Sequence, residues 1–465
     1  MEAIEARNRE LEVDDRRYIW HPFTQMQDYA IEKPLIIERG EGCLLTDIHG
    51  NTYLDGVSSL WTNVHGHRKE KLDLAIRRQL DRIAHSTLLG LSNVPAIQLA
   101  KELIAIAPKG LTRVFYSDNG STAVEIALKM AFQYHRQVNG KNGDKTKFIA
   151  FKNAYHGDTV GSVSVGGIDI FHEKYSPLLF HAFKAESPYC YRCPFDRAYP
   201  SCGHTCLDRL EALMKAHAHE VCALVIEPLV QGAAGMLVQP PGFLRRVREL
   251  CTAYDILMIA DEVAVGFGKT GRMFACEHEE VAPDMMTLAK GISEGSLPLA
   301  ATLTTDEIYQ GFLGKYEEFK TFFHGHTYTG NPLACAAGIA NLSIFEEERV
   351  LDRLQPKIRQ LAAGLEAFRA LACVGDIRRK GIMVGIELVV DRRSKEPFPP
   401  EEKVGHRVIL EARKRGLIIR PLGNVVVLMP PLAISTEEID RLCDIAFESI
   451  RVVTEQTISA GGSAQ

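Results

Sequence analysis

The sequence lacks an apolar stretch long enough to span a lipid bilayer: even the run Cys222–Ile226 ends at the charged Glu227. Residues 1–17 form a mixed-charge segment that lacks the apolar core of a secretory signal peptide. These two absences lead us to expect a cytoplasmic protein that does not engage a membrane.

The sequence also lacks a basic surplus. It has 54 lysines and arginines against 59 aspartates and glutamates, a formal net charge of −5, whereas nucleic-acid binders normally carry a basic surface. No internal repeat or low-complexity block is found. What is present is a chain of 465 residues with 46% hydrophobic residues, longer than one core usually supports. We expect a globular enzyme of two or more domains that binds small molecules and no nucleic acid.

Short apolar runs alternate with longer helical patterns through the middle of the chain. Within 121–136, Ala123, Ile126 and Met130 recur at helical spacing. The apolar runs do not alternate with polar residues, which is typical of strands covered on both faces. This order predicts an α/β domain with a mainly parallel sheet. The predicted strands are Arg113–Ser117, Lys147–Phe151, Cys222–Ile226, Ile256–Ala260 and Met285–Leu288.

The pattern changes after Gly338, where helical stretches precede the strand-like runs Ile382–Val389 and Val425–Met429. This mixture predicts a second, smaller α+β domain. The predicted division is 1–58 as an N-terminal segment joining the small domain, 59–338 as the large domain, 339–456 as the small domain, and 457–465 as a disordered tail.

Three polar segments follow predicted strands, at the edge where α/β proteins bind ligands. Gly120 and Ser121 begin a helix whose N-terminus attracts phosphate, although taken alone such residues are more often an ordinary N-cap. Asp261 follows Ile256–Ala260, where it projects into the ligand crevice or lies in an ordinary turn. Lys290 follows Met285–Leu288, and taken alone it reads as a lysine that reaches solvent.

Taken together, these segments resemble the class III aminotransferases, members of the fold-type I pyridoxal-phosphate enzymes. The resemblance runs from about Trp20 to Leu432. It implies a large domain with a mainly parallel seven-stranded sheet, a smaller α+β domain, and a homodimer with shared active sites. The segments that carry it are His21-Pro22-Phe23-Thr24-Gln25, Tyr155-His156-Gly157-Asp158, Asp261-Glu262-Val263, Ala289-Lys290-Gly291, His324-Gly325-His326-Thr327 and Arg420-Pro421-Leu422-Gly423.

The resemblance also implies a role for each site residue. Lys290 would hold pyridoxal 5′-phosphate covalently and carry the transferred proton. Asp261 would keep the pyridine nitrogen protonated, so that the ring can accept electrons, and Tyr155 would stack on that ring. The remaining implied contacts are phosphate binding by Gly120, Ser121 and Thr327 of the partner subunit, and substrate binding by Trp61, Tyr155, Lys290 and Arg420, with Arg420 taking a carboxylate.

Among class III enzymes, the resemblance is strongest to those that convert 8-amino-7-oxononanoate to 7,8-diaminononanoate in biotin biosynthesis. Members that use S-adenosylmethionine tend to have tyrosines where this chain has Phe23 and Val427. The amino donor therefore stays open between S-adenosylmethionine and lysine.

Cys190, Cys193, Cys202 and Cys206 have nearly the spacing of a metal site, with His204 between them. They lie in a proline-rich segment, and transamination needs no metal, so we expect free thiols and no metal.

Three other functions remain open. They are a different class III transaminase acting on an ω-amino acid or diamine, a catalytically silent pyridoxal-phosphate-binding regulator, and a cysteine-ligated redox protein.

Overall fold

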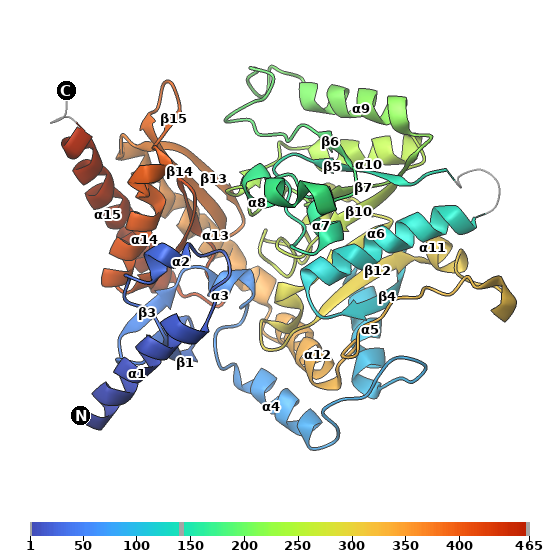
Figure 1. Cartoon of the computed structure of the whole chain (residues 1–465), viewed down its shortest axis with the longest axis horizontal. Coiled ribbons are helices and arrows are strands. Elements are labelled where there is room, and N and C mark those ends of the chain that lie inside the picture. Colours follow the sequence, from blue (N-terminus) through green and yellow to red (C-terminus); the bar gives the residue numbers. More distant parts are fainter. Residues whose placement is uncertain (1, 139–143, 462–465) are drawn as a thin grey trace.

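The computed structural model of the chain describes residues 2–138 and 144–461. In Figure 1 the N-terminal segment (dark blue) and the C-terminal segment (dark orange to red) form one lobe, and the middle of the chain forms the other. None of the helices in these described ranges is both long enough and apolar enough to cross a membrane.

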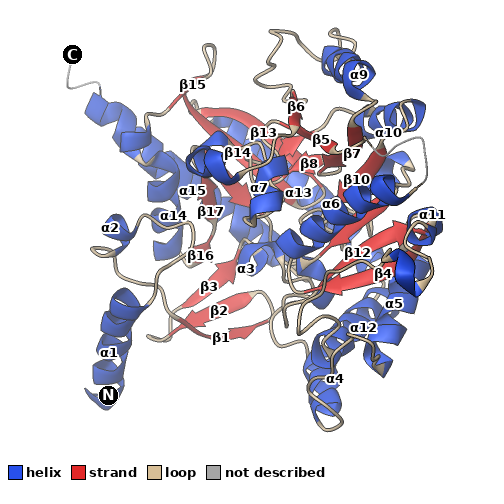
Figure 2. Cartoon of the chain, turned by 45° about the vertical axis from the view of Figure 1, so that its right-hand side comes forward, coloured by secondary structure: helices blue, strands red, loops and turns tan. Residues whose placement is uncertain are grey.

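A seven-stranded sheet forms the middle of the larger lobe (Figure 2). Its β12 runs antiparallel to both neighbours, and the other six strands share one direction. The predicted fold class, a mainly parallel seven-stranded sheet, is confirmed. In spatial order the strands are β4 (Leu111–Ser117), β12 (Ala300–Thr305), β11 (Met285–Leu288), β10 (Leu257–Asp261), β7 (Val221–Ile226), β5 (Lys147–Phe151) and β6 (Phe183–Ala185).

Helix α6 (Gly120–Gln137) covers one face of this sheet. It begins there because the Asn119 side chain accepts the N–H of Thr122, while the Thr122 hydroxyl accepts the N–H of Asn119. Its buried Ile126 and Met130 pack in one apolar cluster with strand residues such as Ile259. Other helices of this lobe are α4 (Glu70–Leu80), α5 (Val94–Ile106), α7 (Val160–Val165), α8 (Asp169–His172), α9 (Thr205–His217), α10 (Phe243–Ala253) and α11 (Asp306–Gln310).

Helix α12 (Pro332–Glu347) packs against α4 and α5 and continues without a break through the predicted domain boundary at 338/339. Asn331 sets its start, because its side chain accepts the N–H groups of Leu333 and Ala334, and Pro332 occupies the first turn. A domain boundary does not fall inside a continuous helix. The division of the chain into domains stays a proposal, with the boundary between the large and the small domain moved to the end of α12.

The smaller lobe joins the two ends of the chain. Leu54 of β3 pairs in parallel with Leu417 of β16, so the N-terminal strands and a C-terminal strand share one sheet. That sheet has the order β1 (Ile37–Glu41), β2 (Leu44–Asp47), β3 (Thr52–Asp55), β16 (Leu417–Ile418), and the second one has the order β13 (Val374–Lys380), β14 (Met383–Asp391), β18 (Val425–Leu428), β17 (Arg420–Leu422), with β15 (Glu396–Pro397) on β14. The helices are α1 (Glu2–Tyr18), α2 (Met26–Tyr29), α13 (Val350–Glu366), α14 (Val404–Lys414) and α15 (Thr436–Gly461).

The expected disordered tail from residue 457 is wrong in its first part, because α15 continues to Gly461. The Thr457 hydroxyl accepts a hydrogen bond from Arg407 of α14 at 2.9 Å and donates to the Val453 carbonyl at 2.8 Å. These contacts hold the helix past the predicted end. Residues 462–465 lie outside the described ranges.

Candidate active site

A cavity of about 500 Å³ opens at the carboxyl ends of the parallel strands. The loops that follow β4, β5, β7, β10 and β11 all contribute to its wall, as the switch-point rule for α/β sheets predicts. Six predicted site residues meet here: Trp61, Gly120, Ser121, Tyr155, Asp261 and Lys290 line this one cavity.

Lys290 leaves the end of β11 with a left-handed backbone, φ +48°. Its Nζ lies 5.3 Å from the centre of the Trp61 ring, within cation–π range. Burial lowers the pKa of the Lys290 amine, and the nearby carboxylates of Asp261 and Glu227 oppose that shift. A lysine with a lowered pKa has more of the neutral amine needed to attack a carbonyl.

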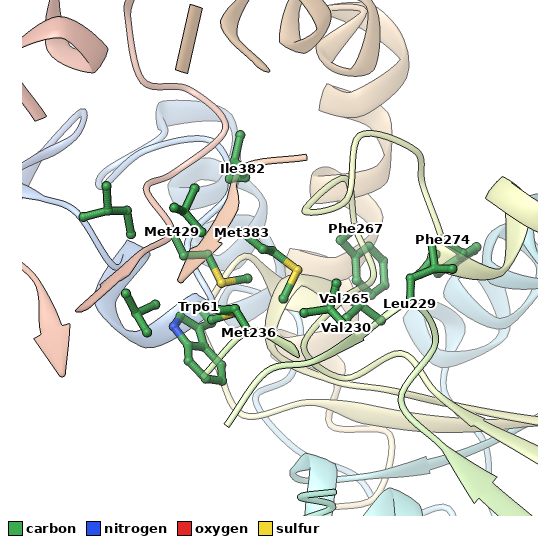
Figure 3. Close-up of a cluster of buried hydrophobic side chains, with 14 of the residues drawn as sticks. Trp61, Leu229, Val230, Met236, Val265, Phe267, Phe274, Ile382, Met383 and Met429 are labelled. Atoms are coloured by element: carbon green, nitrogen blue, oxygen red, sulfur yellow. The ribbon is translucent and has the colours of Figure 1, made fainter. Parts of the chain in front are cut away.

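Trp61 reaches the cavity through an unusual turn, α3 (Ser58–Trp61), in which all four residues have positive φ. The Asp55 carboxylate accepts the backbone N–H and the hydroxyl of Ser59, and Lys269 donates to the Ser58 hydroxyl at 3.1 Å. These bonds hold a backbone conformation that L-residues rarely adopt. Figure 3 shows Trp61 among buried side chains that include Met236, Met383 and Met429.

Asp261, at the end of β10, is buried and hydrogen-bonded through both carboxylate oxygens. Its Oδ1 accepts from the Thr287 hydroxyl at 3.0 Å and from the Val263 N–H at 3.1 Å. Its Oδ2 lies 2.7 Å from Nδ1 of His156, whose Nε2 is buried without a partner among the described residues. The carboxylate therefore occupies one fixed orientation.

Glu227 is a cavity residue that the sequence did not mark as functional. It follows β7 and accepts the N–H groups of Tyr155 and Gly232. Burial raises the pKa of Glu227 to about 7. The sequence contained a feature that could have identified Glu227, since this acidic residue directly follows a buried apolar run, as Asp261 does.

Gly120 and Ser121 form the N-terminal turn of α6 at the cavity wall. A Cβ on Gly120 would lie 2.7 Å from Val263 Cγ1, and one on Gly157 would lie 1.8 Å from the Ser121 hydroxyl. A side chain at Gly120 would therefore displace Val263, and at Gly157, where φ is +116°, only glycine fits. The Ser121 hydroxyl accepts the Asp158 N–H at 2.9 Å.

Arg420 begins β17 and is half-buried. Within the described chain its guanidinium has no hydrogen-bond or ion-pair partner. Burial lowers the pKa of Arg420, and the neighbouring Tyr155 raises it. Arg420 does not line the cavity, but Tyr155, which does, lies beside it.

The two positions that bear on the amino donor differ in their surroundings. The Phe23 ring is 56% exposed, and its centre lies 6.5 Å from that of Tyr155. The Val427 side chain is fully buried, on the strand position that pairs with Arg420. Only Phe23 therefore has room for the hydroxyl of a tyrosine.

Thr327 is exposed and does not line the cavity of its own chain. Nδ1 of its neighbour His326 lies 3.0 Å from Oδ2 of Asp118, a residue that lines the cavity. The structure thus brings this loop near the Gly120 turn without bringing Thr327 into it.

The four cysteines of the proline-rich segment and His204 surround a small cavity of about 20 Å³. All 11 cysteines of the chain are free thiols. No group of three or more His, Cys, Asp or Glu side chains in residues 2–138 and 144–461 is arranged to hold a metal ion.

The cavity residues fit pyridoxal phosphate. The Lys290 amine can bond to its aldehyde, the Tyr155 ring offers an aromatic face, and the Asp261 carboxylate is an anion for a protonated ring nitrogen. The N-terminal turn of α6, which begins at Gly120 on the cavity wall, supplies backbone N–H groups of the kind that bind a phosphate.

Comparison with known proteins agrees with this chemistry. The family model for class III aminotransferases matches residues 26–450. Adenosylmethionine-8-amino-7-oxononanoate aminotransferase of Nitratidesulfovibrio vulgaris is 60% identical, over 98% of this chain and 84% of the relative. The enzyme of that name from Geobacter sulfurreducens is 58% identical, over 95% and 97% of the two chains.

Solved structures show the same relationship. The crystal structure of adenosylmethionine-8-amino-7-oxononanoate aminotransferase from Methanocaldococcus jannaschii has a TM-score of 0.91 at 49% identity, covering 95% of this chain and 99% of that one. The omega transaminase of Pseudomonas jessenii, crystallised in complex with PMP, has a TM-score of 0.91 at 32% identity, covering 96% and 98%. The chain belongs to the class III aminotransferases and is a pyridoxal-phosphate-dependent transaminase.

Proposed function

We propose that this enzyme transfers an amino group from S-adenosylmethionine to 8-amino-7-oxononanoate, giving 7,8-diaminononanoate for biotin biosynthesis. Full-length relatives that are 45–60% identical and named for this reaction support the proposal. The observation in the site that carries it is the Arg420 guanidinium, which has no partner in the described chain and lies beside Tyr155. Near one end the acceptor has a ketone beside an amine; it has a carboxylate at the other end and an apolar chain between them.

The residues divide the work as follows. When bound, pyridoxal phosphate supplies an electron sink for the charge left when a proton leaves the amine-bearing carbon. Lys290 Nζ takes that proton and returns it, which its lowered pKa favours. Asp261, held by His156 and Thr287, fixes the proton on the ring nitrogen. Arg420 binds the acceptor carboxylate through two parallel hydrogen bonds, and Trp61 walls the pocket.

We further propose a homodimer with shared sites, in which Thr327 of the partner subunit contacts the phosphate. Exposed aromatic side chains around this loop support it, since Phe323 is 72% and Tyr328 62% exposed in the single chain.

Mixing Lys290→Ala subunits with Thr327→Glu subunits tests directly whether the active sites are shared. A mixed dimer then has one site with both changes and one with neither, so about half of the wild-type activity per mixed dimer returns. Absence of any recovery after verified subunit exchange, or an active monomer by sedimentation, contradicts sharing.

The decisive test of the reaction is an assay of product formation from 8-amino-7-oxononanoate with S-adenosylmethionine or lysine as donor. Formation of 7,8-diaminononanoate with S-adenosylmethionine supports the proposal. Rapid amination of pyruvate or another simple oxo acid, with none of 8-amino-7-oxononanoate, favours an ω-transaminase, the alternative that the similarity to the Pseudomonas jessenii enzyme keeps open. The cytoplasmic location stays a prediction.

A further inference from the structure

Asn341, in the middle of α12, is a buried amide with every hydrogen-bonding atom used. Its side chain is 0% exposed. Its Nδ2 donates to the carbonyls of Gly291 at 2.9 Å and Ile292 at 3.1 Å. Its Oδ1 lies 2.9 Å from Nε2 of His65. Burial lowers the pKa of His65 to about 4, so at neutral pH the ring is uncharged and its Nε2–H donates. The amide has therefore only one orientation that satisfies all three partners.

The two carbonyls that Asn341 binds come directly after Lys290. Lys290 itself has φ +48°, in the left-handed region, and begins a single 3-10 turn, η3 (Lys290–Ser293). A non-glycine residue in that region is strained and persists only when its surroundings fix it. The space is tight on the other side, since a Cβ on Gly291 would lie 2.7 Å from Phe267 Cβ.

The same turn is tied to the segment that carries Trp61. Glu294, at the end of η3, accepts the N–H groups of Val64 at 3.3 Å and His65 at 3.1 Å. His65 is thus bound through its backbone to Glu294 and through its ring to Asn341. Trp61, four residues before His65, has its ring 5.3 Å from Lys290 Nζ.

We propose that Asn341 is a positioning residue for Lys290. Its two donated hydrogen bonds hold the left-handed turn that directs Nζ into the cavity. Its hydrogen bond to His65 fixes the position of the segment that carries Trp61 relative to that turn. Asn341 touches neither cofactor nor substrate. The inference rests on the proposed role of Lys290 as the residue that holds the cofactor and moves the proton.

Replacing Asn341 by leucine keeps the approximate volume and removes all three hydrogen bonds. Two buried carbonyls then lose their donor, and the turn can relax toward negative φ, which moves Nζ away from its place. Because Lys290 acts in the chemical step, kcat should fall about tenfold or more while KM for the acceptor stays within about twofold. Asn341→Asp keeps the shape and the bond to His65 but loses the donor pair, so it should give a similar fall.

A spectroscopic readout separates positioning from stability. In the holoenzyme, the pH midpoint at which the visible absorbance of the lysine-bound cofactor changes reports on the surroundings of Nζ. We expect Asn341→Leu to shift this midpoint by about 0.5 pH unit or more. Asn8→Leu is the matched control: Asn8 is also buried, and its amide donates to a backbone carbonyl, that of Ile48, outside the cavity. It should lower the unfolding temperature without moving the midpoint or kcat.

The outcomes are distinct. If Asn341→Leu behaves like Asn8→Leu, lowering stability and leaving midpoint and kcat at wild-type values, the positioning role is overturned. If Asn341→Leu does not fold, the isosteric Asn341→Asp decides by the same two measurements. A wild-type enzyme with no lysine-bound absorbance would instead refute the proposed role of Lys290, which is a separate failure.

Discussion

Nδ1 of His156 lies 2.7 Å from Oδ2 of Asp261, and both side chains are buried. With Thr287 and the Val263 N–H on the other oxygen, the carboxylate has donors on both oxygens. A carboxylate fixed in this way can hold a proton on a ring nitrogen without rotating away from it. We therefore expect His156 to strengthen the interaction between Asp261 and the protonated ring nitrogen of the cofactor.

The first prediction concerns this pair. His156→Leu removes one charge-assisted hydrogen bond, worth about 1.5–3 kcal/mol, so turnover should fall about 10- to 100-fold. His135→Leu is the matched control, because His135 is also buried but bonds only the Cys222 carbonyl. Steady-state kinetics of cofactor-saturated enzyme measure both. Equal activity of the two variants would rule out a role for His156 in the site.

Lys290→Ala should abolish turnover and leave the fold intact. It removes the covalent attachment and the proton carrier together, so we expect a loss of at least about 10⁴-fold. Circular dichroism checks the fold. Lys152→Ala, which removes an exposed lysine paired with Glu186 outside the cavity, should retain full activity. Turnover within tenfold of wild type in Lys290→Ala would place the attachment elsewhere.

Arg420→Lys should weaken acceptor binding more than donor binding. A lysine keeps the charge but loses the planar fork that grips a carboxylate, so KM for the acceptor should rise about tenfold or more. Half-reactions followed separately with donor and acceptor measure this. Arg415→Lys, at an exposed arginine paired with the partly buried Glu411, should change neither half-reaction. Equal effects of Arg420→Lys on both half-reactions would refute the role.

Phe23→Tyr tests the amino donor. One new hydrogen bond is worth about 0.5–1.5 kcal/mol, so KM for S-adenosylmethionine should fall about two- to tenfold while activity with lysine stays the same. The ring is exposed and can carry a hydroxyl. Val427→Tyr should instead destabilise the fold, because Val427 is fully buried and overpacking a core costs about 1–3 kcal/mol. An unchanged KM for S-adenosylmethionine in Phe23→Tyr contradicts the prediction.

Glu262 gives a prediction about pH. It is buried, accepts the N–H groups of Ala275 and Cys276, and burial raises its pKa to about 7. Between about pH 4.5 and 7 the folded state therefore binds more protons at this site than the unfolded state, and its contribution to stability is lost as the pH rises through 7. Glu262→Gln mimics the protonated carboxyl and should remove this pH-dependent loss of stability, which is on the order of 3 kcal/mol.

The measurement is the unfolding free energy of wild type and Glu262→Gln between pH 5 and 8 (roughly the range over which the group titrates). Glu249→Gln, on α10 with an exposed side chain, is the control. The same slope in wild type and Glu262→Gln would show that the carboxyl does not carry this effect.

Strands buried on both faces were predictable from sequence. β5 and β11 have the predicted bounds, and β10 differs by one residue at each end, because continuous apolar runs report burial directly. β12 was missed because it mixes alanine and threonine. Its Thr302 is fully buried, and its hydroxyl donates to the Ala123 carbonyl of α6. A polar side chain satisfied by a distant helix leaves no hydrophobic signal.

The site was predictable only in part. The strand-end rule singled out Asp261 and Lys290, and the resemblance supplied their roles. Asn341 was not predicted, and His156 was noted only as part of a segment that carries the resemblance, without a role. A buried amide or imidazole differs from an exposed one only through partners far along the chain. Those partners, Gly291 and Asp261, are 50 and 105 residues away.

The pairing of β3 with β16 bears on how the enzyme is made. Leu54 of β3 pairs with Leu417 of β16. One edge of β3 therefore has no strand to pair with until almost the whole chain has left the ribosome. Arg420 follows three residues later, so the proposed carboxylate contact is also among the last parts of the chain to be made. Contacts this distant in sequence form slowly, and an edge strand that waits for its partner is prone to pair with another chain. Shortened chains that end before residue 417 should therefore accumulate as aggregates instead of as a stable larger lobe.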